Sequence, residues 1–313
     1  MSDLIVRSLQ AGESELFESF GAPAPQGTGP DQDTYRTRAE QGQYRPEWTW
    51  VALEGGVPVA RAAFWGLPDG RHPIQLTFFD PGSGPDRHRR GRLLLEAAYA
   101  ATRTEDGERP RYQLKVLPGW RDSEQARRAI EERVSCVTSL GMALFVERLS
   151  FSWTPADGLP SRNGALTFGP AADDAAVCEV LARISDGTLD VGTRANVERV
   201  GRARAADEEL ALMQEMYPSS RPSWRLAYLG GEAAGIVVPA KNLQGAQIAY
   251  IGLVPEYRGR GHVDQLLAEG THILAATGVD EVWATTDHGN APMAAAFARS
   301  GYRNDDAMLI YRW

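Results

Sequence analysis

Apolar and polar positions alternate along several short segments of the chain, a pattern typical of strands with one buried face. In the first half these segments are residues 4–9, 48–53, 57–65, 74–79, 112–117 and 143–153. In the second half they are residues 165–168, 224–229, 233–238, 248–254, 281–286 and 307–313. Between them, apolar residues three and four positions apart predict helices over residues 13–20, 90–102, 123–140, 173–184, 205–217, 263–277 and 291–300. Strands that alternate with helices indicate a mixed sheet with helical crossovers.

Two stretches rich in proline and glycine interrupt this pattern. Residues 21–30 are predicted to form a loop, because proline and glycine disfavour regular structure there. Residues 159–164 have the same character and separate two series of elements. We therefore predict a linker at this point and two domains, over residues 1–156 and 157–313.

The second series of elements repeats the first in a weak form. Four landmark residues of the first half recur in the same order in the second: Trp50, Pro81, Gly141 and Trp153 correspond to Trp224, Pro255, Gly301 and Trp313. Any one of these matches could arise by chance. Four in one order favour an internal duplication.

Composition limits the classes of function. The chain has 41 acidic and 33 basic residues, and neither half has the clustered basic face that binds nucleic acid. Cys136 and Cys178 lie in apolar helical patterns without metal-ligand spacing, so we interpret both as core residues and expect no metal. No segment reaches the roughly 18 successive apolar residues of a membrane span. With no signal-peptide run either, we expect a cytoplasmic protein without a membrane partner, either a monomer or a dimer.

A loop with two glycines carries the most specific chemistry. A predicted strand ends at Leu253-Val254-Pro255, and Arg258-Gly259-Arg260-Gly261 follows before a predicted helix. The glycines allow backbone N–H groups to face one small concavity beside the positive end of the helix dipole. We expect the two arginines to add mobile positive charge. Such a loop binds a pyrophosphate, unless it is only a tight turn at the surface.

These residues resemble a motif of the GNAT (Gcn5-related N-acetyltransferase) superfamily, in which a strand ending in V-x-P precedes the loop R/Q-x-x-G-x-G/A and a helix. Arg258 and Gly261 match this loop, while Val263 stands where the family usually has Gly or Ala and would crowd it slightly. Further on, Asn290 with Gly301-Tyr302 resembles the N-x(10)-G-F block of the family. The resemblance is strong over residues 224–313 and weak over residues 4–153.

The resemblance implies an α+β fold of two tandem GNAT domains, each a mixed, mostly antiparallel sheet flanked by helices, similar to the two-domain architecture of mycothiol synthases. It implies an N-acyltransferase in which the amine of a small molecule attacks the thioester of bound acetyl-CoA or another acyl-CoA. The implied donor-binding residues are Leu253, Val254, Arg258, Gly259, Arg260, Gly261, His262, Val263 and Asn290. A backbone N–H near Leu253 would polarise the thioester carbonyl. Asn290 equally fits an N-cap for the helix that starts at Ala291.

The sequence does not assign the residues that would transfer protons. Many relatives have a Glu as general base where this chain has Gln247, and a Tyr as acid where it has Phe297. The nearby replacements are Tyr250, Asp287, His288 and Tyr302. Each also has a simpler interpretation: a tyrosine packed in the sheet, two residues of a turn, and a core aromatic. Otherwise the reaction relies on positioning and a partly deprotonated amine.

The first half lacks the loop, because residues 86–92 contain a single glycine among four arginines and a histidine. We interpret this segment as a degenerate cofactor site in a structural copy, although a solvated basic helix start fits as well. Two other functions stay open. One is a catalytically silent acyl-CoA-binding module, which Gln247 and Phe297 favour. The other is a GNAT-like transferase with an aminoacyl-tRNA donor, against which the lack of a basic face argues.

Overall fold

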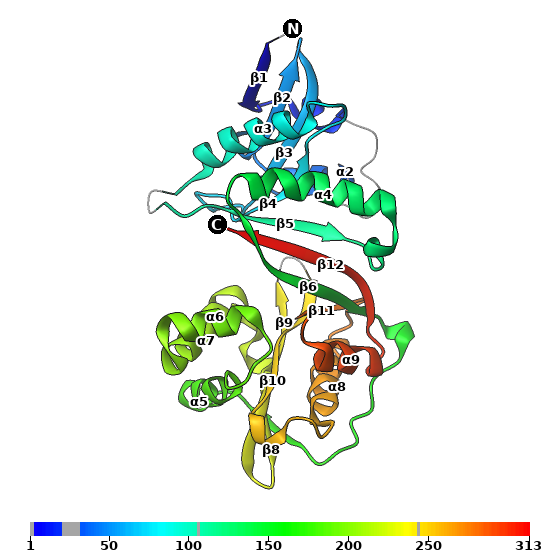
Figure 1. Ribbon diagram of the computed structural model, residues 1–313. Helices are drawn as coiled ribbons and strands as arrows, with labels where there is room; N and C mark the ends of the chain where they lie inside the picture. The colour runs from blue at the N-terminus through cyan, green and yellow to red at the C-terminus, as the bar shows by residue number, and fades with distance from the viewer. Residues whose placement is uncertain (1–2, 21–31, 105–106, 243–244) are drawn as a thin grey trace. The chain divides into compact units, whose positions relative to one another are not determined.

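The chain folds into two compact units in a computed structural model that describes residues 3–20, 32–104, 107–242 and 245–313. The first unit consists of Met1–Glu147 and Asp306–Trp313, and the second of Arg148–Asp305. The loop predicted over residues 21–30 lies outside the described residues. Figure 1 shows each unit as a sheet with helices packed on it.

The first unit has a sheet with the strand order β1-β2-β3-β4-β5-β12. Its strands are β1 (Leu4–Ser8), β2 (Thr49–Glu54), β3 (Val57–Trp65), β4 (Gln75–Asp80), β5 (Arg111–Val116) and the later part of β12 (Arg303–Arg312). Its helices are α1 (Ser14–Glu18) and α2 (Gln32–Glu40) between β1 and β2, α3 (Arg87–Thr102) between β4 and β5, and α4 (Glu124–Ser139) after β5. Neighbouring strands are antiparallel except β4 and β5, which are parallel.

The second unit has the strand order β6-β11-β10-β9-β8-β7. Its strands are the later part of β6 (Ala143–Trp153), β7 (Thr167–Pro170), β8 (Arg225–Leu229), β9 (Glu232–Asn242), β10 (Gly245–Leu253) and β11 (Val282–Asp287). Its helices are α5 (Asp174–Ile184), α6 (Val191–Val200) and α7 (Arg202–Met216) between β7 and β8, α8 (His262–Ala275) between β10 and β11, and α9 (Ala291–Arg299) after β11. Only the β10–β11 pair is parallel among these described strands.

The two units repeat one order of elements and one pairing pattern, which confirms the internal repeat. In both, helices follow the first strand, three antiparallel strands come next, and a helix leads to a parallel strand. The hairpins match as well. Two glycines with positive φ join β2 to β3, and two more join β8 to β9, as a tight hairpin turn requires.

The last strand of each repeat belongs to the sheet of the other repeat. β12 pairs with β5, with Ala307 opposite Val116 and Tyr311 opposite Tyr112. β6 pairs with β11, with Trp153 opposite Val282. The compact units therefore divide at Glu147 and at Asp306, whereas the sequence analysis predicted a boundary between residues 156 and 157. Alternation shows that a segment is a strand, but it does not show which sheet it joins.

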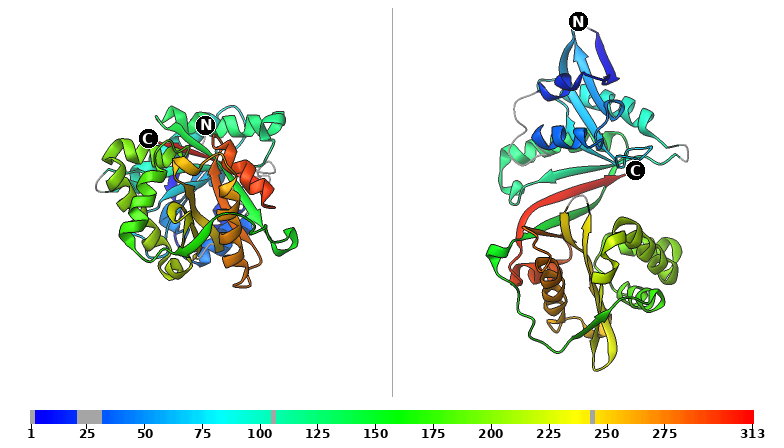
Figure 2. Two further views of the ribbon diagram at one scale, coloured as in Figure 1. Left: turned by 90° about the horizontal axis from the view of Figure 1, so that it is seen from below. Right: turned by 180° about the vertical axis from the view of Figure 1, so that it is seen from behind.

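Helices cover both faces of the second sheet, and Figures 1 and 2 show α8 and α9 on one side of it and α5, α6 and α7 on the other. The two sides have separate cores. One contains Leu266 and Leu267 of α8 with Phe297 of α9. The other contains Leu181 of α5 and Leu210 of α7. Side chains of β10 contribute to both cores, so this strand lies between the two helical layers.

The sequence prediction missed two helices, α2 and α6. Neither has a strong apolar stripe: α6 buries none of its residues completely, so periodicity gives no signal. The predicted core role of the cysteines is confirmed for Cys136, which is buried, while Cys178 is half-buried against the α5–α7 core. Within the described ranges, no helix has both the length and the apolar character that crossing a bilayer requires.

Candidate functional site

β10 and β11 separate halfway along β10. The two strands pair only where Ala246 to Ile248 lie opposite Val282 to Ala284. β10 continues to pair with β9 as far as Leu253, with an irregularity between Ile248 and Tyr250. β11 continues to pair with β6 as far as Asp287. Beyond Ile248 the two strands therefore share no ladder, and a gap opens between them.

The backbone N–H of Leu253 faces this gap. The next N–H, that of Val254, donates to the carbonyl of Ala234 at 3.0 Å. In an antiparallel ladder this bond makes Leu253 and Gly235 a non-hydrogen-bonded pair, whose own N–H and C=O groups point away from each other. The Leu253 side chain is buried, so it is the backbone that this residue presents to the gap.

The glycine loop leads from the end of β10 into α8. Gly259 and Gly261 have φ of 72° and 77°, a left-handed conformation that favours glycine. A Cβ at either position would meet no atom within 4 Å, so both glycines border open space. α8 starts at His262, and the first N–H groups of a helix have no partner within it. The loop and the helix end thus present backbone donors to one open region.

Arg258 is not mobile, which corrects the prediction for this side chain. Its Nε donates to the carbonyl of Leu253 at 2.9 Å, and its two terminal nitrogens donate to the carbonyls of Ile184 and Asp186, each at 2.6 Å. Burial lowers the pKa of its guanidinium. The side chain ties the end of β10 to the C-terminus of α5. Arg260, in contrast, is exposed.

Three further predicted donor-binding residues have structural contacts. Asn290 accepts a hydrogen bond from the N–H of Met293 at 3.3 Å, which confirms it as the N-cap of α9. The Nδ1 of His262 lies 3.2 Å from the Nε2 of Gln265. Val263 packs against the α8–α9 core, so its side chain does not crowd the loop.

The candidates for proton transfer lie in different surroundings. Gln247 is in the paired part of β10, opposite Ala240 on β9 and Trp283 on β11. Tyr250 follows the irregularity of β10, at the point where the gap opens. Burial raises the pKa of its phenol, and the negative charges of Glu209 and Asp190 raise that pKa further. Tyr250 therefore keeps its proton at neutral pH and can donate a hydrogen bond.

Asp287 and His288 differ in their surroundings, and the observed contacts of Asp287 leave it unsuited to act as a base. The Asp287 carboxylate is buried and accepts from the Nε of Arg148 at 3.0 Å and from the N–H of Val191 at 2.7 Å. Both oxygens are thus used to anchor the start of α6 to the end of β11. His288 is exposed on the turn after β11. The interpretation of these residues as parts of a turn therefore holds for His288 but not for Asp287, which ends the strand.

Two aromatic residues belong to the core. The Tyr302 hydroxyl shares a hydrogen bond of 2.8 Å with Thr271, and burial raises its pKa. Phe297 stacks on Phe151, with their ring centroids 4.9 Å apart. Neither reaches the gap through a described contact, so the interpretation of Tyr302 as a core aromatic is confirmed.

One acidic residue near the gap was missed by the sequence analysis. Glu209 lies on α7 three residues after Ala206 and four before Met213, both of which are buried. This spacing places it on the core-facing side of the helix, where a carboxylate is uncommon. The signal was present in the sequence, because the apolar period of α7 already assigns Glu209 to the buried stripe.

The corresponding segment of the first unit has no open glycine loop. Gly91 is buried, and a Cβ there would come within 3.0 Å of Pro81, Cys136 and Phe79. Three of its arginines form ion pairs within the unit: Arg87 with Glu132, Arg90 with Glu54, and Arg92 with Glu96. Charges already neutralised by carboxylates have less attraction left for a phosphate.

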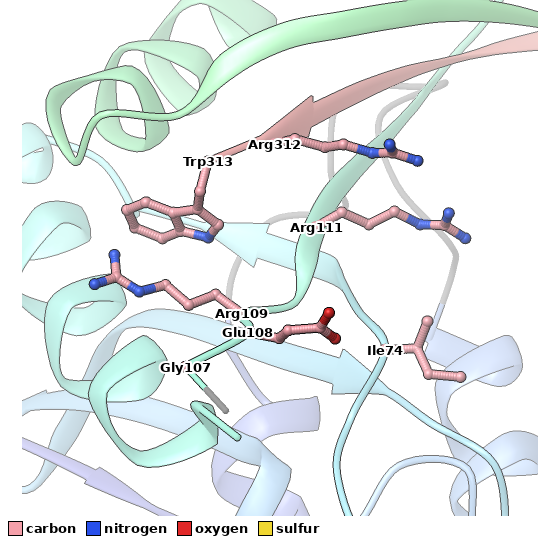
Figure 3. Close-up of a pocket in the computed structure, with 7 residues that line it drawn as sticks. All are labelled: Ile74, Gly107, Glu108, Arg109, Arg111, Arg312 and Trp313. Carbon is pink, nitrogen blue, oxygen red and sulfur yellow. The ribbon is translucent and has the colours of Figure 1, made fainter. Parts of the chain in front are cut away.

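A depression of about 800 Å³ also lies in the first unit (Figure 3). It is lined by Ile74, Gly107, Glu108, Arg109, Arg111, Arg312 and Trp313. Its arginines contact neighbouring side chains. Arg109 lies over the Trp313 ring, Arg312 over that of Phe145, and Arg111 donates to Gln75. Because Arg111 lies in the paired part of β4 and β5, this depression is not the counterpart of the gap between β10 and β11.

Comparisons with known proteins find matches over part of the chain and over its fold. Residues 196–302 match the model of the acetyltransferase (GNAT) family. A mycothiol acetyltransferase of Clavibacter michiganensis subsp. michiganensis is 36% identical over 67 residues, which cover 21% of this chain and 22% of that protein. The match thus spans about a fifth of the relative's length.

Two solved structures resemble the whole chain. A GCN5-related N-acetyltransferase from Sphaerobacter thermophilus has a TM-score of 0.57 and 15% identity, covering 99% of this chain and 95% of its own. The glucosamine N-acetyltransferase region of a fungal multi-domain β-N-acetylglucosaminidase has a TM-score of 0.54 and 13% identity, covering 99% of this chain and 38% of its own. At these identities the likeness concerns the fold.

Proposed function

Because residues 196–302 match the model of the acetyltransferase (GNAT) family, we propose that the protein transfers an acyl group from acyl-CoA to the amine of a small molecule. The observation that carries this proposal is the gap between β10 and β11. It has the outward N–H of Leu253 on one wall and the open glycine loop at its end. The tandem GNAT fold is the frame for this site, and the site lies in the second repeat.

The loop suits the pyrophosphate of CoA. Backbone N–H groups around Gly259 and Gly261 and at the start of α8 bind the phosphates, and the exposed Arg260 adds positive charge. Arg258 contributes indirectly, because its three hydrogen bonds hold the loop against α5. The pantetheine arm then lies along the free edge of β10, with Asn290 at its side, while Val254 is buried in the α5–α7 core and supports this edge.

The thioester is placed at the gap between the two helical layers. The amine attacks the thioester carbon, so a C–N bond forms as the C–S bond breaks. The N–H of Leu253 stabilises the negative charge that develops on the carbonyl oxygen. Tyr250 remains protonated and lies where the gap opens, so it is placed to hydrogen-bond the departing thiolate. Gln247 can orient water or acceptor but cannot take a proton.

A silent acyl-CoA-binding module is the second candidate, since Gln247 and Phe297 replace the usual base and acid. Titration of CoA by calorimetry, followed by assays of thiol release from acetyl-CoA with a panel of amines, distinguishes the two. Transfer predicts CoA binding and amine-dependent release of thiol. A silent module predicts binding without release at any pH up to about 9. Failure of CoA to bind at millimolar concentration would remove both.

A further inference from the structure

Glu209 differs from the other acids of α7 in its surroundings. Its neighbour Glu208 forms ion pairs with Arg199 and Arg204, at 2.6 and 3.1 Å. Among the residues that the structure describes, no hydrogen bond or ion pair reaches the Glu209 carboxylate. A half-buried carboxylate without such a partner costs stability, because no hydrogen bond or ion pair replaces the hydration that it loses.

The groups around Glu209 come from four elements. Tyr217, directly after α7, and Tyr250 of β10 pack against the core that contains Ala206, Leu210 and Met213 of α7. The charge of Glu209 acts on both phenols. Asp190, the N-cap of α6, and Arg148 of β6 are the charged groups that act on Glu209. Through Tyr250, the carboxylate is thus within electrostatic reach of the point where β10 and β11 separate.

Arg148 does not neutralise Glu209, because its guanidinium is shared by two other acids. It donates to Asp287 at 3.0 Å and to Asp190 at 3.2 Å. Asp190 also caps α6 by accepting from the N–H of Thr193 at 2.6 Å. This cluster of three carboxylates and one guanidinium therefore has excess negative charge, although the charge of Arg258 also acts on Tyr250. This charge would attract a cation. Asp190 and Asp287 already bind Arg148, so Glu209 is the carboxylate of the three that is available to bind the cation.

We infer that Glu209 is the catalytic carboxylate that receives the ammonium group of a cationic amine acceptor and takes its proton. The inference rests on the proposed function. One proton passes from the ammonium to Glu209, and the neutral amine forms the C–N bond as the C–S bond breaks. The second proton leaves the nitrogen for the departing thiolate, so that amide and free thiol are the products. Glu209 returns its proton to solvent.

The position of Glu209 suits this role energetically. Burial raises the pKa of its carboxyl, Asp190 raises it further, and Arg148 lowers it. A carboxylate whose pKa is raised is a stronger base than an exposed carboxylate. The difference between its pKa and that of an ammonium group is then smaller, so proton transfer from the ammonium group costs less free energy. The rate should accordingly rise with pH through the ionisation of Glu209.

Glu209→Gln tests the inference, with Glu208→Gln as the matched control on the adjacent residue. The probes are glucosamine, tyramine and spermidine, each with acetyl-CoA. We expect kcat/KM of Glu209→Gln to fall by about 10²–10⁴, as for loss of a general base. The acidic limb of its pH profile should disappear while its Kd for CoA is unchanged. Glu208→Gln should stay within about twofold of the wild type.

Stability gives a readout that does not depend on turnover. A carboxyl whose pKa is raised in the folded state destabilises the protein once it ionises. This destabilisation is absent at pH values below the pKa of the unfolded state and reaches its full size above the pKa of the folded state. Glu209→Gln should therefore melt above the wild type at pH 7.5 and not at pH 4, whereas Glu208→Gln, which loses ion pairs, should not gain.

Two results would overturn the inference in different ways. Wild-type kcat/KM and an unchanged acidic limb in Glu209→Gln would remove Glu209 from the reaction and leave the transferase intact. Absence of thiol release by the wild type with all three amines, while acetyl-CoA is bound, would remove the proposed transfer and this role with it.

Discussion

The Nε of Arg258 donates to the carbonyl of Leu253 at 2.9 Å, so the arginine of the loop holds the last residue of β10. The same side chain binds the carbonyls of Ile184 and Asp186 at the end of α5. Leu253 thus has its carbonyl occupied, while its N–H faces the gap. A residue expected to bind phosphate instead positions the backbone around the site.

Arg258→Lys should destabilise the protein. Lysine keeps the charge but replaces a planar fork of donors by one ammonium, so at least one and up to three hydrogen bonds are lost. At about 1 kcal/mol each, the free energy of unfolding should fall by about 1–3 kcal/mol, measured by urea denaturation. The exposed Arg260→Lys is the control and should change little. Equal stability of both variants would show that Arg258 is not a clamp.

Gly261→Glu should weaken CoA binding at least tenfold, or about 1.4 kcal/mol, because it places a carboxylate where the pyrophosphate is proposed to bind. Gly278→Glu is a matched control after the other end of α8. Gly278 has φ of 73° against 77° for Gly261, and neither Cβ would meet an atom within 4 Å. Both variants therefore carry the same backbone strain and charge. Equal CoA affinities in a calorimetric titration would place the donor elsewhere.

Calorimetry should also give one CoA per chain. The first unit has the matching β4–β5 separation, but Gly91 is packed against Pro81 and the nearby arginines are ion-paired. Backbone donors are therefore not open there as they are around Gly261. Two CoA molecules per wild-type chain and one per Gly261→Glu chain would show that the first repeat binds a ligand of its own.

Phe297→Tyr should not restore an acid. Phe297 is 1% exposed and stacks on Phe151, so a new hydroxyl there would be buried in an apolar core. An unpaired buried hydroxyl costs about 1–3 kcal/mol, and urea denaturation should show a loss of this size. Thiol release should not increase. A gain in rate without loss of stability would mean that this position reaches the donor sulfur.

Much of the fold could be predicted because local pattern determines it. The strand over residues 143–153 was placed at its observed bounds, and the helix that ends at Ile184 to within one residue. The site loop was recognisable because glycine adopts the positive φ of positions 259 and 261 without the steric cost that other residues have. Such features depend on a few neighbouring residues, which sequence shows directly.

Long-range features were not predictable in the same way. The exchange of β6 and β12 depends on which sheet edge each strand meets. The alternation of apolar and polar residues within a strand does not show this. The role of Arg258 depends on carbonyls of α5 more than seventy residues earlier in the sequence. Glu209 is the exception, since its place in the apolar period of α7 was visible. Only packing shows that its charge acts on Tyr250 and that no basic side chain of the described residues forms an ion pair with it.

The most direct test of the transferase is thiol release from acetyl-CoA across a broad amine panel, compared between the wild type, Gly261→Glu and Gly278→Glu. The account predicts release that depends on the amine in the wild type, retained in Gly278→Glu and reduced at least tenfold in Gly261→Glu at subsaturating acetyl-CoA. No release from the wild type with any amine up to about pH 9, with acetyl-CoA bound, would contradict it.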